Sequence, residues 1–162
     1  LWEISQFSNN TIIFNRHRSI SKESVTAVAK NDDVITNVNK EIKVYHKDDH
    51  LTKGSHMVKE LYDAYEKRML ELDEIEVVAT KMYIGFKLGK RIISDIQIQK
   101  NSVKLDINMK WGQLTDTREL FRNVSDIGHW GVGDYQCKLT DESELDYVMT
   151  LVRECYKFHS NN

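Results

Sequence analysis

The stretch DIGHWGVGDYQ, residues 126–136, holds the side chains of this sequence that are best suited to chemistry. His129 could act as a general base, oriented by a neighbouring aspartate. No nucleophile is evident beside it, because Ser125 lacks the strand–turn–helix signature of a nucleophile elbow. The three glycines would permit positive φ angles in a turn. We therefore predict a structural corner in which Trp130 is buried at the sheet edge and His129 binds a backbone group. Ligand contact and catalysis are the alternatives.

Basic residues gather between positions 81 and 110, although the whole chain carries a formal net charge of −2. Cations on one sheet face can contact phosphates, and an aromatic ring among them can stack on a base. This pattern predicts a binding site for nucleic acid or another ligand, comprising Lys81, Tyr83, Lys87, Lys104, Lys110, His129 and Trp130. A solvated sheet face protected by lysines is the alternative.

Two further motifs contain residue types found in metal sites or phosphate loops, but not the spacing or setting that such sites require. The segment 46–50 with His56 is rich in histidine and aspartate, but the spacing is not diagnostic of a metal site. Gly89 and Lys90 lack the strand–loop–helix setting of a phosphate loop and predict a hairpin turn. We therefore assign no metal, no cofactor and no catalytic residue to this chain.

Composition bounds the class of protein. The chain has 162 residues, of which 40% are hydrophobic and 30% charged, as expected of one globular domain with a solvated surface. It has no apolar run of about 18 residues, so we expect no membrane span. The two cysteines, Cys137 and Cys155, are too few for a secreted disulfide scaffold and favour a cytoplasmic location. Composition leaves a homo-oligomer open.

Periodicity predicts an α+β fold. Apolar residues recur at helical spacing over 55–72 and 140–158, and alternate over 80–87, 91–99 and 102–110. Tight turns join these three strands, and 134–139 reads as a fourth, whereas 114–128 predicts a short helix or turn. We expect an antiparallel meander of three to four strands, with an N-terminal and a C-terminal helix packed on one face.

Three zones follow along the chain. Residues 1–15 predict a β-hairpin, 16–41 a polar linker, and 42–162 the compact domain. A chain that opens within a strand is typical of a piece of a longer protein.

An ordered set of motifs resembles a bacterial and archaeal domain of unknown function. The motifs are YHKDDHL (45–51), ELYDAYEKRMLEL (60–72), EVVATKMYIGFK (76–87), DIQIQKNSVKLDIN (95–108), NVSDIGHWGVGDY (123–135) and LDYVMTLV (145–152). In that family the domain follows a restriction-endonuclease-like domain of the PD-(D/E)xK type. Residues 1–15 resemble the last hairpin of that upstream domain, although the family commonly has a basic residue where Ser5 and Gln6 stand here.

The resemblance implies a function for the chain. It implies a non-catalytic accessory or binding domain of a nuclease-like protein, with any nuclease active site upstream of Leu1. With the basic sheet face, it points to nucleic acid and the upstream domain as partners. A small-ligand-binding or partner-docking domain of a cytoplasmic protein is the alternative.

Overall fold

The structure is a computed structural model that describes residues 2–6, 12–16 and 44–161. The chain divides into two units, Leu1–Lys43 and Val44–Asn162. In the first unit, β1 (Trp2–Gln6) pairs antiparallel with β2 (Ile12–Arg16), Trp2 lying opposite Arg16. The predicted linker, residues 16–41, lies outside the described residues except for Arg16.

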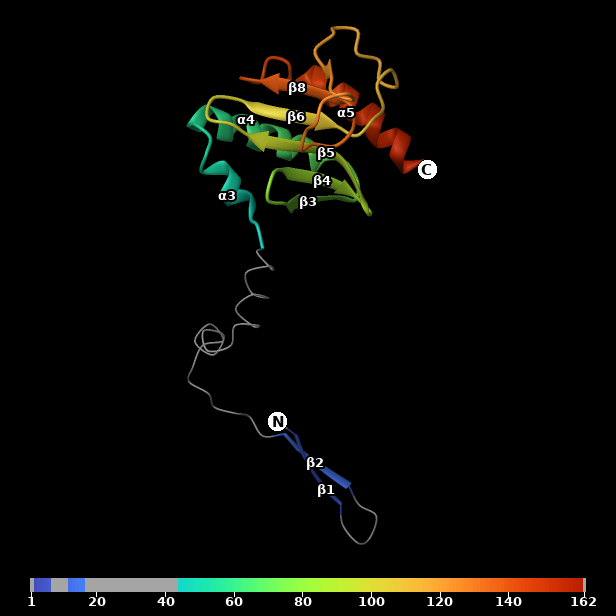
Figure 1. Ribbon diagram of the computed structural model, residues 1–162. Coiled ribbons are helices and arrows are strands. Elements are labelled where there is room, and N and C mark those ends of the chain that lie inside the picture. The colour runs from blue at the N-terminus through green and yellow to red at the C-terminus, as the bar shows by residue number, and fades with distance from the viewer. Residues whose placement is uncertain (1, 7–11, 17–43, 162) are drawn as a thin grey trace. The chain divides into compact units, whose positions relative to one another are not determined.

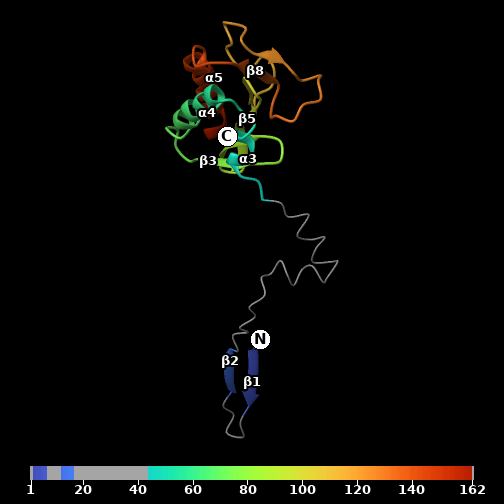
Figure 2. The same ribbon diagram turned by 90° about the vertical axis from the view of Figure 1, so that its left-hand side faces the viewer.

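The second unit is an α+β domain built on one antiparallel sheet. Its elements are α3 (Lys47–Leu51), α4 (His56–Met69), β3 (Ile75–Ala79), β4 (Ile84–Leu88), β5 (Arg91–Ile98), β6 (Val103–Ile107), β7 (Arg122–Asn123), β8 (Tyr135–Leu139) and α5 (Leu145–Ser160). The strand order is β3-β4-β5-β6-β8-β7. Helices α4 and α5 lie on the same side of this sheet (Figures 1 and 2).

Alternation along the central strands separates an inner face, toward the helices, from an outer face. Ile96 of β5 lies opposite Leu105 of β6, which lies opposite Cys137 of β8. All three side chains are buried in the hydrophobic cluster beneath the helices. Because successive strand residues point to opposite faces, their sequence neighbours belong to the outer face. Asp95 and Asp106 are two of them, in line with the alternation of apolar and polar residues over 91–99 and 102–110.

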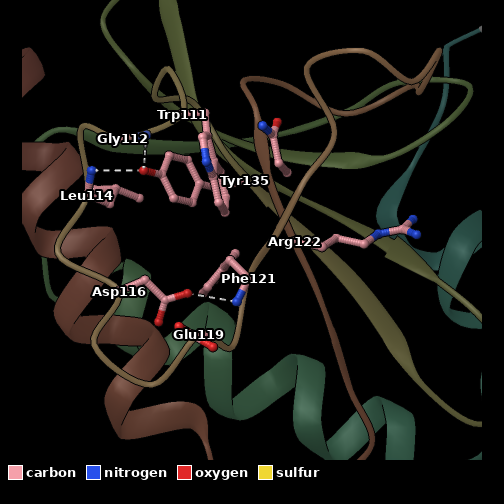
Figure 3. A pocket seen from close by; sticks show the side chains of 9 residues that line it. Trp111, Gly112, Leu114, Asp116, Glu119, Phe121, Arg122 and Tyr135 are labelled. Carbon is pink, nitrogen blue, oxygen red and sulfur yellow. Dashed lines mark hydrogen bonds between the residues drawn. The ribbon is translucent and has the colours of Figure 1, made fainter.

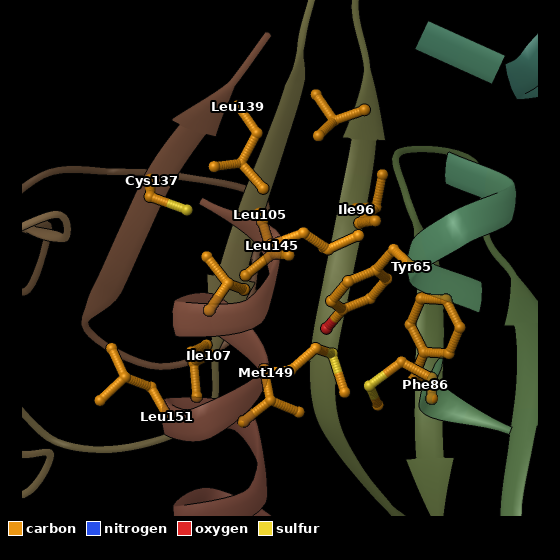
Figure 4. Packing of buried hydrophobic residues seen from close by; sticks show 14 of the residues in the cluster. Tyr65, Phe86, Ile96, Leu105, Ile107, Cys137, Leu139, Leu145, Met149 and Leu151 are labelled. Atoms are coloured by element: carbon orange, nitrogen blue, oxygen red, sulfur yellow. The ribbon is translucent and has the colours of Figure 1, made fainter. Parts of the chain in front are cut away.

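The core fills the space between the inner face and the two long helices. Figure 4 shows Tyr65 and Phe86 at one end of the cluster and Cys137 and Leu139 at the other, with side chains of α5 between them. The rings of Tyr65 and Phe86 meet edge to face with centroids 5.1 Å apart. The buried Tyr65 hydroxyl lies 2.6 Å from Ser94 Oγ, which satisfies both groups. Each such buried side chain contributes about 1.5–3 kcal/mol by leaving water.

The described sheet has six strands, not the three to four that periodicity predicted. The short edge strand β7 carries no alternation to detect, and β3 is a strand that the pattern missed. Residues 80–83 form a turn, not the start of a strand, because the Thr80 hydroxyl oxygen accepts the N–H groups of Met82 and Tyr83. The segment 114–128 contains no helix.

Both cysteines are free and buried. Burial raises the pKa of Cys155 to about 12 and also raises that of Cys137. Within the part of the chain that the structure describes, no helix has both the length and the apolar character needed to cross a membrane.

Candidate functional site on the outer face of the sheet

A row of polar residues crosses the outer face at one level. Asp95 of β5 lies directly opposite Asp106 of β6, Asp106 opposite Gln136 of β8, and Gln136 opposite Arg122 of β7. On the other side of Asp95 the row continues to Gly85 of β4. Four strands therefore bring two carboxylates, an amide and a guanidinium group together.

The two carboxylates are buried, although they lie on the face away from the helices. Asp95 and Asp106 are both 0% exposed. Asp106 accepts hydrogen bonds from the side-chain amides of Gln136 (2.8 Å) and Gln97 (3.3 Å). Asp95 accepts the backbone N–H of Val132 at 2.8 Å through Oδ2, whereas its Oδ1 atom has no hydrogen-bond partner. An ionised carboxylate in this position is incompletely compensated.

Burial and mutual repulsion shift both acids toward their protonated form. Burial is the main reason that the pKa of Asp95 rises to about 8, and the charge of Asp106 adds to it. Burial also raises the pKa of Asp106, while the Gln136 hydrogen bond and the charges of His129, Lys104 and Arg122 oppose the rise. Two carboxylates that face each other in a buried site favour holding one proton between them.

The loop that contains the GHWG motif covers this carboxylate pair. A Cβ atom on Gly131 would lie 2.3 Å from Asp106 Cγ, so the loop backbone rests directly on that carboxylate. Gly133 has a φ angle of +71°, and a Cβ atom there would lie 2.2 Å from the backbone oxygen of Ile107. The close approach of the loop thus depends on these two glycines.

His129 closes the loop on itself. Its Nδ1 atom lies 2.9 Å from the backbone oxygen of Ile127, and its Nε2 atom lies 2.9 Å from that of Gly133. This contact with backbone groups agrees with the structural interpretation of the motif. The expected burial of Trp130 is wrong, because 66% of this residue is exposed. Gly131 and Gly133 pack against the sheet in its place.

Cations border the covered carboxylates on the side of β8. Lys104 of β6 lies directly opposite Lys138 of β8, so two like charges face each other across the ladder. Both line a hollow of about 360 Å³ that Arg122 also lines, here called the cationic hollow. Its further lining residues are Gln99, Leu120, Gln136 and Cys137. Arg122 donates to the side-chain oxygen of Gln136, which holds the guanidinium group at this surface.

The predicted binding residues separate into two groups. Lys104, His129 and Trp130 lie at or beside the carboxylate pair. Tyr83 joins them, because its ring packs over Gly85 and burial together with the charge of Asp95 raises its pKa.

The three other predicted lysines lie elsewhere. Lys87 forms an ion pair with Glu76 at 2.8 Å, across β3 and β4. Lys81 is exposed in the 80–83 turn. Lys110 is exposed in the loop after β6, and its backbone N–H donates to Gln113. These positions are not brought to the cationic hollow.

Sequence reasoning missed five residues of the site: Asp95, Asp106, Gln136, Arg122 and Lys138. Alternation placed the two aspartates correctly on the polar side but could not show that a distant loop buries them. Lys138 and Arg122 lie outside the segment of dense basic charge, and only the pairing of β8 with β6 and β7 joins them to Lys104.

Comparison with known proteins places the domain in a family. Residues 47–159 match a family model described as a domain of unknown function, DUF5655. The chain belongs to this family. A relative from Haemophilus influenzae, described as an uncharacterized protein, is 38% identical over 159 residues. The match covers 97% of the present chain and 52% of that relative, so the chain spans about half the relative's length. No solved structure shows a significant match.

In the part of the DUF5655 chain that the structure describes, no group of three or more histidine, cysteine or acidic side chains is arranged to hold a metal ion. The carboxylate pair has amide and backbone partners in place of further acidic ligands. The outer face therefore combines a buried carboxylate pair, in which both pKa values are raised, with the half-buried Lys104, the exposed Arg122 and Lys138, and the exposed Trp130.

Proposed function

We propose that this DUF5655 domain is a non-catalytic binding module that contacts nucleic acid through the outer face. The observation that carries the proposal is the cationic hollow, in which Lys104, Arg122 and Lys138 converge. Across the described residues, none of the three forms an ion pair with a carboxylate within 4 Å. Like charges directly opposite each other in a sheet are destabilising, so a phosphate ligand would relieve a cost present in the free protein.

Trp130 supports the same proposal. Its exposed side chain belongs to the loop that covers the carboxylate pair, in which Ile127 is also exposed. Basic groups that bind the phosphates and a ring that stacks on a base together form the general platform for single strands. The described residues of this face include no helix suited to a groove, so we expect little preference for base sequence.

The place of this module in a longer protein is a proposal that rests on the family resemblance. We propose that it accompanies a restriction-endonuclease-like domain and helps that domain engage nucleic acid. No catalytic residue is assigned within this chain.

Charge reversal in the cationic hollow tests the binding function. The variant combines Lys104→Glu, Arg122→Glu and Lys138→Glu, and fluorescence anisotropy measures its binding to an oligonucleotide at low and moderate salt. Losing three phosphate contacts should reduce the slope of log affinity against log salt by about 2–3. Trp130→Ala should weaken binding to a single strand by about 1–3 kcal/mol, since it removes a stacking surface.

A control variant separates the effect of losing the cationic hollow from the effect of changing the net charge. Lys59→Glu, Lys67→Glu and Lys157→Glu change the charge equally on exposed positions of α4 and α5. The proposal requires this control to retain the salt slope. Equal loss in both variants, or binding of the unmodified domain weaker than about 100 μM at low salt, contradicts it.

A further inference from the structure

A second pocket lies beside the edge strand β7, and the proposed nucleic-acid site does not use its interior. Its volume is about 450 Å³, and aromatic side chains form much of its lining. Figure 3 shows Trp111 and Tyr135 along one side of this pocket and Asp116 with Glu119 on the other. We call it the aromatic pocket.

The wall that carries Trp111 is held in place by buried groups. The Tyr135 hydroxyl oxygen accepts the backbone N–H groups of Gly112 at 2.7 Å and Leu114 at 3.1 Å. The Trp111 ring lies 4.6 Å from the Tyr135 ring, at an interplanar angle of 32°. The Trp111 backbone N–H donates to Asp134 at 2.8 Å. Although Trp111 is 45% exposed, it is therefore fixed before any ligand arrives.

The opposite wall is acidic. Burial acts to raise the pKa of Asp116, but hydrogen bonds from Phe121, Tyr147 and Leu120 outweigh this effect and lower it. Asp116 is thus a stable carboxylate whose oxygens already have partners within the chain. Asp116 therefore contributes negative charge to the pocket, but its oxygens are not free to bind a ligand.

Glu119 is the free acidic group. Its carboxylate has neither a hydrogen bond nor an ion pair among the residues that the structure describes, although the neighbouring Arg118 pairs with Glu144 at 3.0 Å. Glu119 also has a φ angle of +52°, a left-handed conformation that side chains with a Cβ atom rarely adopt. Such strain is typical of positions kept for function.

Among the described residues that line the pocket, Arg122 is the one cation, and it does not neutralise this wall. In Figure 3 the Arg122 side chain points away from the pocket. Its guanidinium group is bound to Gln136, on the outer face. The interior therefore joins an exposed indole face to two carboxylates, which favours a cation and disfavours a phosphate.

We propose that the aromatic pocket binds a guanidinium group. A guanidinium ion is planar and weakly hydrated, so it can stack on Trp111 while its N–H groups donate to the Glu119 carboxylate. Its source is an arginine side chain of a partner protein or a small guanidinium-bearing molecule. The site goes beyond the nucleic-acid function, because its lining and its charge differ from those of the cationic hollow.

NMR titration with N-acetyl-arginine amide tests this proposal, with N-acetyl-citrulline amide as a neutral probe of nearly the same shape. The arginine probe should shift the indole N–H signal of Trp111. The citrulline probe should bind at least about tenfold more weakly, because it cannot form a charge-assisted hydrogen bond. Comparing ethylguanidinium with an acetylated Gly-Arg-Gly amide distinguishes the sources: tighter binding of the peptide assigns the pocket to a protein side chain, and the reverse assigns it to a small molecule.

Variants of Glu119 separate recognition from folding. Glu119→Gln should weaken the arginine probe about tenfold, whereas Glu142→Gln, at an exposed acid outside the pocket, should leave its affinity unchanged. Glu119→Gly should weaken binding of the arginine probe at least as much as Glu119→Gln without lowering the melting temperature, since glycine accepts a positive φ freely. Equal affinity for both probes, no effect of Glu119→Gln, or tighter binding of a nucleoside monophosphate at Trp111 would overturn the proposal. None of these results would bear on nucleic-acid binding at the cationic hollow, which the anisotropy experiment tests separately.

Discussion

The buried carboxylate of Asp95 lowers the stability of the folded domain. It is fully buried, one of its oxygens has no partner, and a second buried carboxylate lies directly opposite. An amide of the same shape could still accept the Val132 N–H without carrying charge. A carboxylate at this position therefore costs stability that an isosteric residue would recover.

Asp95→Asn should stabilise the domain in a pH-dependent way. The pKa of Asp95 is about 8 in the folded protein, against an ordinary value of 3.8. Between these values the folded state retains a proton that the unfolded state has lost, so this group lowers the free energy of unfolding as pH rises. The slope approaches about 1.4 kcal/mol per pH unit at most. The gain from the substitution should thus grow from pH 5 to pH 8 and then level off.

Urea unfolding at several pH values measures this effect. Asp126→Asn, at an exposed aspartate of the same loop, should leave the pH dependence as it is. A gain that shrinks as pH rises would show that Asp95 is ionised and compensated in the folded protein.

Alanine substitutions at two glycines of the GHWG loop test whether the loop packs closely against the sheet. Gly133→Ala should destabilise the domain by more than about 1 kcal/mol, because φ is positive and the added methyl group would meet the Ile107 carbonyl. Gly128→Ala should be nearly neutral, because a Cβ atom there has no neighbour within 4 Å. Thermal unfolding compares them. Similar losses in both would mean that the loop does not rest on β6 as described.

At the scale of the elements, the long helices and the central strands were predictable, and the site was not. Periodicity found α4, β5, β6 and β8 because each buries one face along its whole length. It missed β7, which has two residues, and it read the 80–83 turn as strand because Met82 and Ile84 continue the alternation. The carboxylate pair could not be found, because its burial depends on Gly131 and Val132, which follow Asp106 and Asp95 by 25 and 37 residues.

The pairing of β6 with β8 carries its own prediction. Lys104 and Lys138 face each other directly, so Lys138→Glu would replace repulsion by an opposite-charge pair. We expect a stability gain of about 0.2–1 kcal/mol together with weaker nucleic-acid binding. Chemical denaturation and anisotropy measure the two effects. Lys138→Gln should give a smaller gain, and a loss of stability in either variant would show that Lys138 makes a stabilising contact at the sheet edge.

At the scale of the whole molecule, the hydrophobic cluster lies within the second unit, from Val58 to Cys155. A chain of residues 44–162 should therefore unfold cooperatively, with a melting temperature within about 2 °C of that of the full chain. Calorimetry of both chains makes the comparison. If the shorter chain lacked a cooperative transition, residues 1–43 would be part of the folding unit.

The two buried thiols allow local unfolding of the DUF5655 domain to be measured by chemical labelling. Cys137 lies in β8 and Cys155 in α5, and both have raised pKa values, so neither should react with an alkylating reagent while it is covered. The labelling rate of each thiol then measures how often its own element detaches from the core. Since β8 also carries Lys138 and Gln136, a ligand bound at the cationic hollow should slow the labelling of Cys137 more than that of Cys155. The labelling rates of Cys137 and Cys155 thus report separately on the opening of β8 and of α5, without an attached dye.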